Sequence, residues 1–204
     1  MAKIKWGGTI KNAAEYQCGE LSPDAVKMKM PGTIGEMQLR SLPFMIPFLL
    51  ICFAAMFVKT YFSDEMVIAP AGLPLGILLG FLMIPLHELL HAVVYPSKAV
   101  VTIGIMPKQL TAVALASYPL SRGRFALMSL LPVLLGVVPF AVFIAAPTEM
   151  KILNGLMFGM SMMGFCSVSP DMYNVYQMLR QTPEGAKIQF YGDDTYYISK
   201  DRFR

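Results

Sequence analysis

The chain has 204 residues, of which 55% are hydrophobic and 15% are charged, and its net charge is +4. This balance excludes an ordinary soluble domain, in which about a quarter of the residues are charged. The basic residues flank apolar stretches and form no continuous basic face, so we expect no nucleic-acid partner. Three cysteines, far apart in the sequence, exclude a disulfide framework and a cysteine zinc site.

Four stretches are long and apolar enough to cross a bilayer, which takes about 20 residues as a helix. Lipid offers no hydrogen-bond partners to the backbone, so we predict that all four are helical. They cover residues 42–62, 72–95, 125–147 and 152–176. No signal-peptide core follows the charged N-terminus, so we expect the first stretch to remain as an anchor.

A fifth apolar stretch, residues 99–118, is interrupted by Pro-Lys-Gln at 107–109. Its two arms are rich in β-branched residues, which predicts a β-hairpin associated with the membrane. A second hairpin is expected in the C-terminal run 187–200, with its turn at Gly-Asp-Asp 192–194.

The expected fold class is an all-α integral membrane protein with four transmembrane helices, a membrane-associated β-hairpin and short cytoplasmic β-rich termini. The expected domains are a cytoplasmic N-terminal segment at 1–41, a four-span core at 42–180 and a cytoplasmic tail at 181–204. Lysine and arginine near span ends are retained on the cytoplasmic side. With both termini in the cytoplasm of a bacterial plasma membrane, only Lys59 and Lys151 of the 17 basic residues lie outside.

The only two histidines stand four residues apart, with a glutamate after the first, in His87-Glu88-Leu89-Leu90-His91. On a helix, residues i and i+4 share one face, so both imidazoles can bind one Zn²⁺ while Glu88 lies near a metal-bound water. This pattern is typical of zinc hydrolases. The same three side chains could also form a buried polar network or a proton relay, and that alternative stays open.

A catalytic zinc normally has three protein ligands and one open position. The carboxylates in or near the spans are Asp64, Glu65, Glu149 and Asp171. The topology places the first three on the outside, whereas Asp171 lies at a depth similar to that of the histidines, counted from the cytoplasmic side. We therefore predict Asp171 as the third ligand, with a helix-terminal aspartate after Pro170 as the alternative.

The motif on one span, followed by Ser169-Pro170-Asp171 on a later one, resembles the site-2 protease type of intramembrane metalloprotease. More closely, residues 72–176 resemble a family of small bacterial membrane proteins described as putative zincin peptidases. The resemblance implies zinc bound by the two histidines and Asp171, with Glu88 as the base, and cleavage of a substrate within or beside the membrane. Met172 follows the aspartate where site-2 proteases usually have glycine.

A transmembrane helix hides its peptide bonds, so a substrate must be extended before a metal can reach a carbonyl. The hairpin at 99–118 could pair with such a strand by edge addition. Asn174 lies one helical turn after Asp171 and is a candidate for a hydrogen bond to that ligand or to the substrate backbone, with an ordinary interfacial residue as the alternative.

The sequence therefore predicts an intramembrane zinc metalloendopeptidase that uses a zinc-activated water and Glu88 as general base. Its cofactor is expected to be Zn²⁺, and its partners a membrane protein or peptide substrate and the lipid bilayer. One alternative is a zinc hydrolase of a lipid-linked or small amide. The other is a non-enzymatic transporter or adaptor with His87, Glu88 and His91 as a proton relay, although no internal repeat typical of transporters is visible.

Overall fold

The computed structural model describes residues 2–107 and 111–199 and divides into two compact units. The first unit comprises Met1–Met37, Pro85–Leu131 and Asp171–Arg204, and the second comprises Gln38–Ile84 and Pro132–Pro170. Both units are therefore assembled from segments that are far apart in the sequence.

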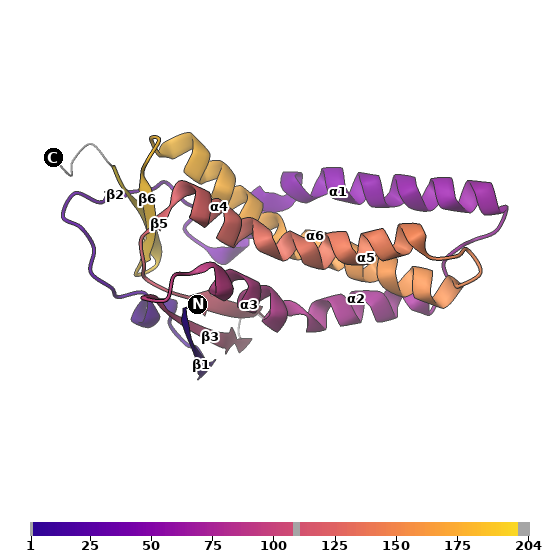
Figure 1. The fold of residues 1–204 in the computed structure, drawn as a ribbon, viewed down its shortest axis with the longest axis horizontal. Coiled ribbons are helices and arrows are strands. Elements are labelled where there is room, and N and C mark those ends of the chain that lie inside the picture. The colour runs from indigo at the N-terminus through magenta and orange to yellow at the C-terminus, as the bar shows by residue number, and fades with distance from the viewer. Residues whose placement is uncertain (1, 108–110, 200–204) are drawn as a thin grey trace. The chain divides into compact units, whose positions relative to one another are not determined.

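Apolar helices form the second unit. It contains most of α1 (Ile34–Ser63), all of α2 (Gly72–Leu82) and α5 (Leu134–Ala145), and the N-terminal part of α6 (Lys151–Gln181). Figure 1 shows these four helices running side by side. They pack around an aromatic-rich core that includes Phe143 and Phe158.

Three helical stretches in the described part of the chain are long and apolar enough to cross a membrane: α1, α6 and Arg122–Ala145. The last combines α4 (Arg122–Leu130), a short 3-10 helix (Leu131–Val133) and α5. Helix α2 passes the same test only together with α3 (Ile84–Val94), as a broken span. The chain is therefore mostly helical, and its apolar helices are compatible with a membrane protein.

The second and third predicted spans are helical but broken. The second is interrupted at Met83, and Pro85 follows directly in the first turn of α3. The third is interrupted by the 3-10 helix that contains Pro132. Proline has no N–H to donate and its ring clashes with the preceding turn, which accounts for both interruptions. Hydropathy alone does not detect them because the residues around the breaks remain apolar.

Helix α1 starts before the predicted residue 42 because a capping box begins it at Ile34. Thr33 Oγ1 accepts a hydrogen bond from the N–H of Glu36 at 3.1 Å, and Glu36 Oε2 accepts one from the N–H of Gly32 at 3.1 Å. The first bond satisfies a backbone donor that a helix start otherwise leaves unpaired, and the second pairs the N–H of Gly32 just before the helix. The polar first turn therefore extends the helix beyond its apolar part.

Most of α1 presents an apolar surface. Of its residues only Ser41 and Cys52 are buried, whereas Leu50, Phe57 and Phe62 are 64%, 70% and 81% exposed. A large continuous apolar surface is unfavourable in water and marks a region that contacts lipid or protein. The helix therefore fits a lipid surrounding.

Lys59, near the C-terminal end of α1, satisfies the backbone at the end of α5. Its Nζ donates to the carbonyl oxygens of Phe143 and Ala146 and to Asn154 Oδ1, and the last two distances are 2.7 and 2.8 Å. Asn154 Nδ2 in turn donates to the carbonyl oxygen of Pro147 at 2.8 Å. A cation at a helix C-terminus is favourable because the free carbonyls carry partial negative charge. This lysine therefore has a structural role in the second unit.

Glycines bring α2 and α6 into close backbone contact. A Cβ at Gly76 would overlap the carbonyl oxygen of Leu156, and a Cβ at Gly72 would lie 3.1 Å from the Cα of Gly155. Small residues at such positions are typical of membrane helix pairs, in which van der Waals contact replaces the hydrophobic effect. The two helices approach this closely only because side chains are missing there.

We expect Gly76→Ala to destabilise the protein by about 1–3 kcal/mol, because the new methyl group meets the rigid backbone of Leu156. Unfolding in mixed micelles with increasing SDS measures the change. Gly123→Ala is the matched control: Gly123 is also helical, and its Cβ position has no heavy atom within 4 Å. Equal stability of the two variants would contradict the close approach of α2 and α6.

The first unit contains a three-stranded sheet with the order β1-β3-β4. Strand β1 (Lys3–Thr9) is parallel to β3 (Val100–Met106), and β3 is antiparallel to β4 (Thr111–Leu115). Strands β3 and β4 confirm the predicted hairpin within 99–118, while residues 108–109 of its predicted turn lie outside the described residues. The parallel strand β1 is an addition that the sequence analysis did not predict.

A four-stranded antiparallel sheet of the same unit has the order β2-β7-β6-β5. Its strands are β2 (Val26–Lys27), β5 (Leu120–Ser121), β6 (Lys187–Tyr191) and β7 (Asp194–Ile198). Strands β6 and β7 confirm the predicted C-terminal hairpin, and Gly192 in its turn has a φ of 59°, which favours glycine. The chain is mostly helical and has strands in both hairpins and near both termini, as predicted; the pairing of these strands into two sheets is the addition.

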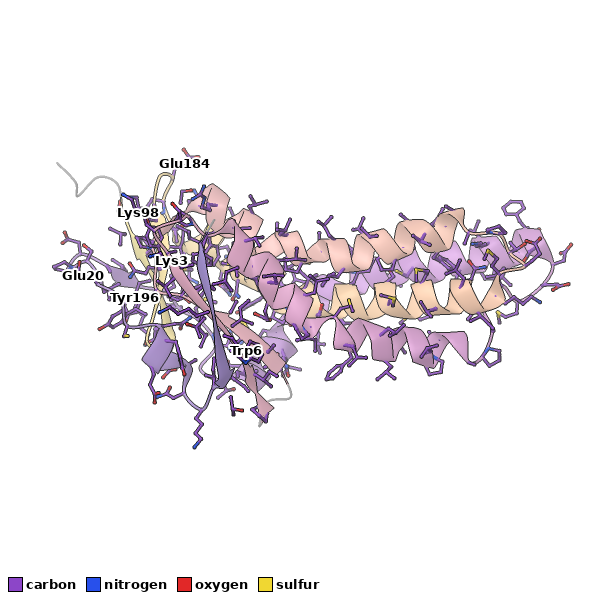
Figure 2. The ribbon with its side chains drawn as sticks, turned by 60° about the horizontal axis from the view of Figure 1, so that its bottom comes forward. Lys3, Trp6, Glu20, Lys98, Glu184 and Tyr196 are labelled. Carbon is purple, nitrogen blue, oxygen red and sulfur yellow. The ribbon has the colours of Figure 1, made fainter. Side chains whose placement is uncertain are left out.

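The larger of two hydrophobic clusters among the described residues of this unit joins its helices to its strands. It takes buried side chains from α3, β3, α4, α6 and β6, which are Ala92, Val101, Ile103, Phe125, Met128, Val175, Met178 and Ile188. Figure 2 labels Lys3 and Trp6 on β1 and Tyr196 on β7; Lys3 is exposed, Trp6 is 66% exposed and Tyr196 is half-buried. The shared core fixes α3, α4, the C-terminal part of α6 and the first sheet relative to one another.

Candidate metal centre

Helix α3 presents the predicted motif on one face. His87, Glu88 and His91 are all buried, and the two imidazole rings lie 4.7 Å apart at an angle of 77°. One potential ligand atom from each of the three residues lies within 4.8 Å of the others. The helical spacing of four residues therefore brings both imidazoles together, as the sequence analysis predicts.

Asp171 on α6 lies against both imidazoles. Its Oδ2 is 3.1 Å from His87 Nε2, and its Oδ1 is 3.5 Å from His91 Nε2. All three residues belong to the first unit, whose core aligns α3 with the C-terminal part of α6. The structure therefore brings the predicted third ligand to the two histidines.

These separations fit a shared metal ion. Zinc binds imidazole nitrogen and carboxylate oxygen at about 2.0–2.2 Å, so neighbouring ligand atoms of a tetrahedral site lie about 3.3 Å apart. The contacts of Asp171 with His87 and His91, at 3.1 and 3.5 Å, bracket this value. Two imidazoles and one carboxylate also form a donor set that occurs in catalytic zinc sites and leaves a fourth position open. The residues present therefore fit zinc.

Glu88 is held next to this donor set by strand β4. Its carboxylate accepts a hydrogen bond from the backbone N–H of Ala114. The side chain is buried together with the histidines but does not need to serve as a ligand, since Asp171 supplies the carboxylate. This arrangement suits a group that exchanges a proton with a water at the site.

The second ring nitrogen of His91 also has a partner. His91 Nδ1 lies 2.8 Å from the backbone carbonyl oxygen of Met128 on α4, and both residues are buried. A carbonyl oxygen only accepts hydrogen bonds, so Nδ1 carries a proton, and Nε2 is the ring nitrogen that faces Asp171. A backbone acceptor leaves no signal in the side-chain pattern, and the sequence analysis did not predict Met128.

Asn174 is the least connected of the predicted site residues. It lies one helical turn after Asp171 on α6, and its Oδ1 is buried without a hydrogen-bond partner among the described residues. A buried acceptor left unpaired costs about 1–3 kcal/mol. Such a group is available to accept a hydrogen bond from a bound molecule or a water.

Comparison with known proteins assigns the chain to a family. A model of the family described as “Putative zincin peptidase” matches residues 80–187. This match covers more than half of the 204 residues. The chain belongs to this family. No curated protein and no solved structure matches it.

Membership of the zincin peptidase family indicates a zinc metallopeptidase and implies zinc as the metal. The matched range runs from the end of α2 to the start of β6 and includes α3, both strands of the hairpin and the predicted site residues on α6. The family match and the clustering of donors on α3 and α6 therefore agree on the same part of the chain.

Proposed function

We propose that this zincin peptidase is a site-2 protease-like intramembrane enzyme that cleaves a peptide bond of a membrane-embedded protein or peptide. The observation that carries the proposal is the convergence of His87 Nε2, His91 Nε2 and both oxygens of Asp171, with Glu88 on the same helical face. This is the donor set and base that metal-assisted hydrolysis requires. A proton relay would use the contacts of Asp171 with both imidazoles as hydrogen bonds, but the family match favours a zinc peptidase.

The chemistry is hydrolysis. When bound, zinc lowers the pKa of a coordinated water toward about 7 and polarises the scissile carbonyl. Glu88 accepts one proton of the attacking water and returns it to the leaving amine, so hydroxyl is added to the acyl carbon as the C–N bond breaks. The N–H of Ala114 orients the Glu88 carboxylate for both transfers.

We propose that the chain crosses the membrane four times. The four spans are α1, α2 together with α3, the stretch Arg122–Ala145, and α6, and both termini lie in the cytoplasm of a bacterial plasma membrane. Support comes from the apolar length of these helices and from the basic residues, which this orientation gathers on the cytoplasmic side. In this arrangement the metal centre lies near the cytoplasmic ends of its helices.

The free edge of β4 is the proposed binding position for an extended substrate. Among the residues that the structure describes, β3 is paired on both sides, whereas β4 is the last strand of its sheet. The N–H of Ala114 donates to Glu88, so it points away from β3 and toward the base. A substrate strand added to this edge would pass beside Glu88 with its backbone paired.

Ala112 tests this position because its N–H points to the same side as that of Ala114 in a strand of period two. We expect Ala112→Pro to lower kcat/KM for a membrane-embedded substrate by about tenfold, the equivalent of one backbone hydrogen bond. Val113→Pro is the contrast, since it removes a bond to β3 and should instead reduce stability. Wild-type kcat/KM in a folded Ala112→Pro protein would contradict strand addition at β4.

Asn174 has a place in the same proposal. Its unpaired, buried Oδ1 would accept a hydrogen bond from an N–H of the bound substrate, one helical turn from the ligand Asp171. The backbone of an extended substrate supplies such donors on both sides of the scissile bond. This role is available only once the substrate is unwound.

A comparison of membrane fractions from cells that contain the wild type or Glu88→Gln tests the proposed function. Mass spectrometry of new protein N-termini should find termini within apolar segments that form only with the wild type. Glu88-dependent products confined to lipid-linked or small amides would contradict the peptidase and favour the alternative zinc hydrolase. No Glu88-dependent product of either kind would contradict hydrolysis altogether.

A further inference from the structure

The hydrogen bond between His91 Nδ1 and the Met128 carbonyl oxygen raises the question of why that carbonyl is available. The two atoms lie 2.8 Å apart in a buried place. Met128 belongs to α4, and a carbonyl inside a helix normally accepts from the N–H four residues later. Such a carbonyl points along the helix axis and is poorly placed for a side chain on another helix.

The residue four positions after Met128 is Pro132, which has no N–H. The preceding N–H, that of Leu131, already donates to the carbonyl oxygen of Leu127. The regular helical donor of the Met128 carbonyl is therefore missing. The helix also changes to a 3-10 turn at Leu131–Val133, where the proline ring cannot fit a regular α-helical turn.

We propose that Pro132 is a positioning residue for the metal centre. By removing the helical donor, it reserves the Met128 carbonyl for His91 Nδ1–H. That bond fixes the tautomer and the ring orientation, and so holds His91 Nε2 toward Asp171, 3.5 Å away. The inference rests on the proposed zinc site, because it assigns Pro132 a role in zinc affinity.

Pro139 shows that a helical proline in this chain need not act in this way. It lies inside α5, and the carbonyl it leaves without a helical donor belongs to Leu135. That carbonyl lies against Gly164, where an added Cβ would overlap it. The carbonyl freed by Pro139 therefore lies where α5 and α6 pack closely. Pro139→Ala is a matched control for the loss of a proline from an apolar helix.

The test measures zinc affinity of purified Pro132→Ala in detergent by competition with a chromogenic chelator. We expect the zinc affinity to fall by about tenfold. This is the lower end of the loss observed when a metal-bound histidine loses the hydrogen-bond partner of its other ring nitrogen. Pro139→Ala should keep wild-type affinity. Wild-type affinity in Pro132→Ala would overturn the inference, whereas absence of zinc from the wild type would overturn the proposed zinc site itself.

A spectroscopic signature separates positioning from general destabilisation. The chain has only two histidines, so ¹⁵N-histidine labelling gives one set of ring signals for each. The His91 signals should report a protonated, hydrogen-bonded Nδ1 in the wild type and in Pro139→Ala, and a weaker bond in Pro132→Ala. Unchanged His91 signals in Pro132→Ala would also overturn the inference.

If Pro132→Ala does not fold, a second variant tests the same hydrogen bond. Replacing Ser129 by its α-hydroxy analogue converts the Met128 carbonyl into an ester carbonyl, a weaker acceptor, while Pro132 stays in place. The inference predicts weaker zinc binding and a weaker His91 Nδ1 hydrogen bond in this protein. Wild-type values for both would overturn it.

Discussion

Replacing Glu88 with glutamine is expected to lower kcat/KM for peptide-bond cleavage by about 10²–10⁴-fold, the contribution typical of a general base. Glutamine has nearly the same shape and keeps an oxygen that can accept the hydrogen bond from Ala114. It cannot take a proton from water. Cleavage rates in proteoliposomes and zinc content by elemental mass spectrometry, measured on the same preparation, check the two halves of this expectation.

The zinc content of this variant also decides which carboxylate is a ligand. Both Glu88 and Asp171 lie close to the histidines, and Glu88 could complete a metal group with them. Full zinc occupancy in Glu88→Gln with lost activity agrees with a base. Loss of zinc from Glu88→Gln, with zinc retained in Asp171→Ala, would exchange the two roles and contradict the account.

Replacing Asp171 with alanine is expected to weaken zinc binding by more than about 100-fold. Loss of a group that only hydrogen-bonds a metal ligand usually has a smaller effect. The variant removes both oxygens that face His87 Nε2 and His91 Nε2. With two imidazoles alone, the zinc ion lacks its third protein ligand. It also lacks the negative charge of the carboxylate, which offsets the positive charge of the ion. Chelator competition measures the affinity.

Asp193→Asn is the control for the loss of a carboxylate. Asp193 is exposed in the turn between β6 and β7 and has no part in the metal centre. Its zinc affinity should equal that of the wild type. An Asp171→Ala protein that binds zinc as tightly as Asp193→Asn would show that Asp171 is no ligand.

The sequence predicts the helices and the metal motif because both depend on local patterns. Apolar length defines a span, and the spacing of His87 and His91 fixes their common face without knowledge of the fold. The two hairpins are predictable for the same reason, since a turn and two short arms lie within one stretch of chain.

The remaining features depend on contacts between distant segments. Strand β1 pairs with β3 across about 90 residues, and its sequence KIKWGGT gives no indication of its partner. The breaks next to Pro85 and Pro132 lie inside apolar stretches that hydropathy treats as continuous. The sequence therefore predicts hairpins and β-rich termini but not their pairing into two sheets, because sheet pairing among distant segments is a long-range property.

Depth along the helices predicts Asp171 as the third ligand but does not predict how its two oxygens are oriented. Its two oxygens face one imidazole each only because α3, α4 and α6 share a core. The bonds from Ala114 to Glu88 and from His91 to Met128 use backbone atoms. Backbone partners are invisible to any motif of side chains, and they are the part of the site that required the structure.

X-ray absorption at the zinc edge of the purified, metal-replete wild-type protein determines the ligands of the proposed metal centre. We expect about one zinc per chain, coordinated by two imidazoles and by oxygen donors, with no sulfur ligand. Absence of bound zinc, a sulfur ligand or a single imidazole would contradict the centre formed by His87, His91 and Asp171.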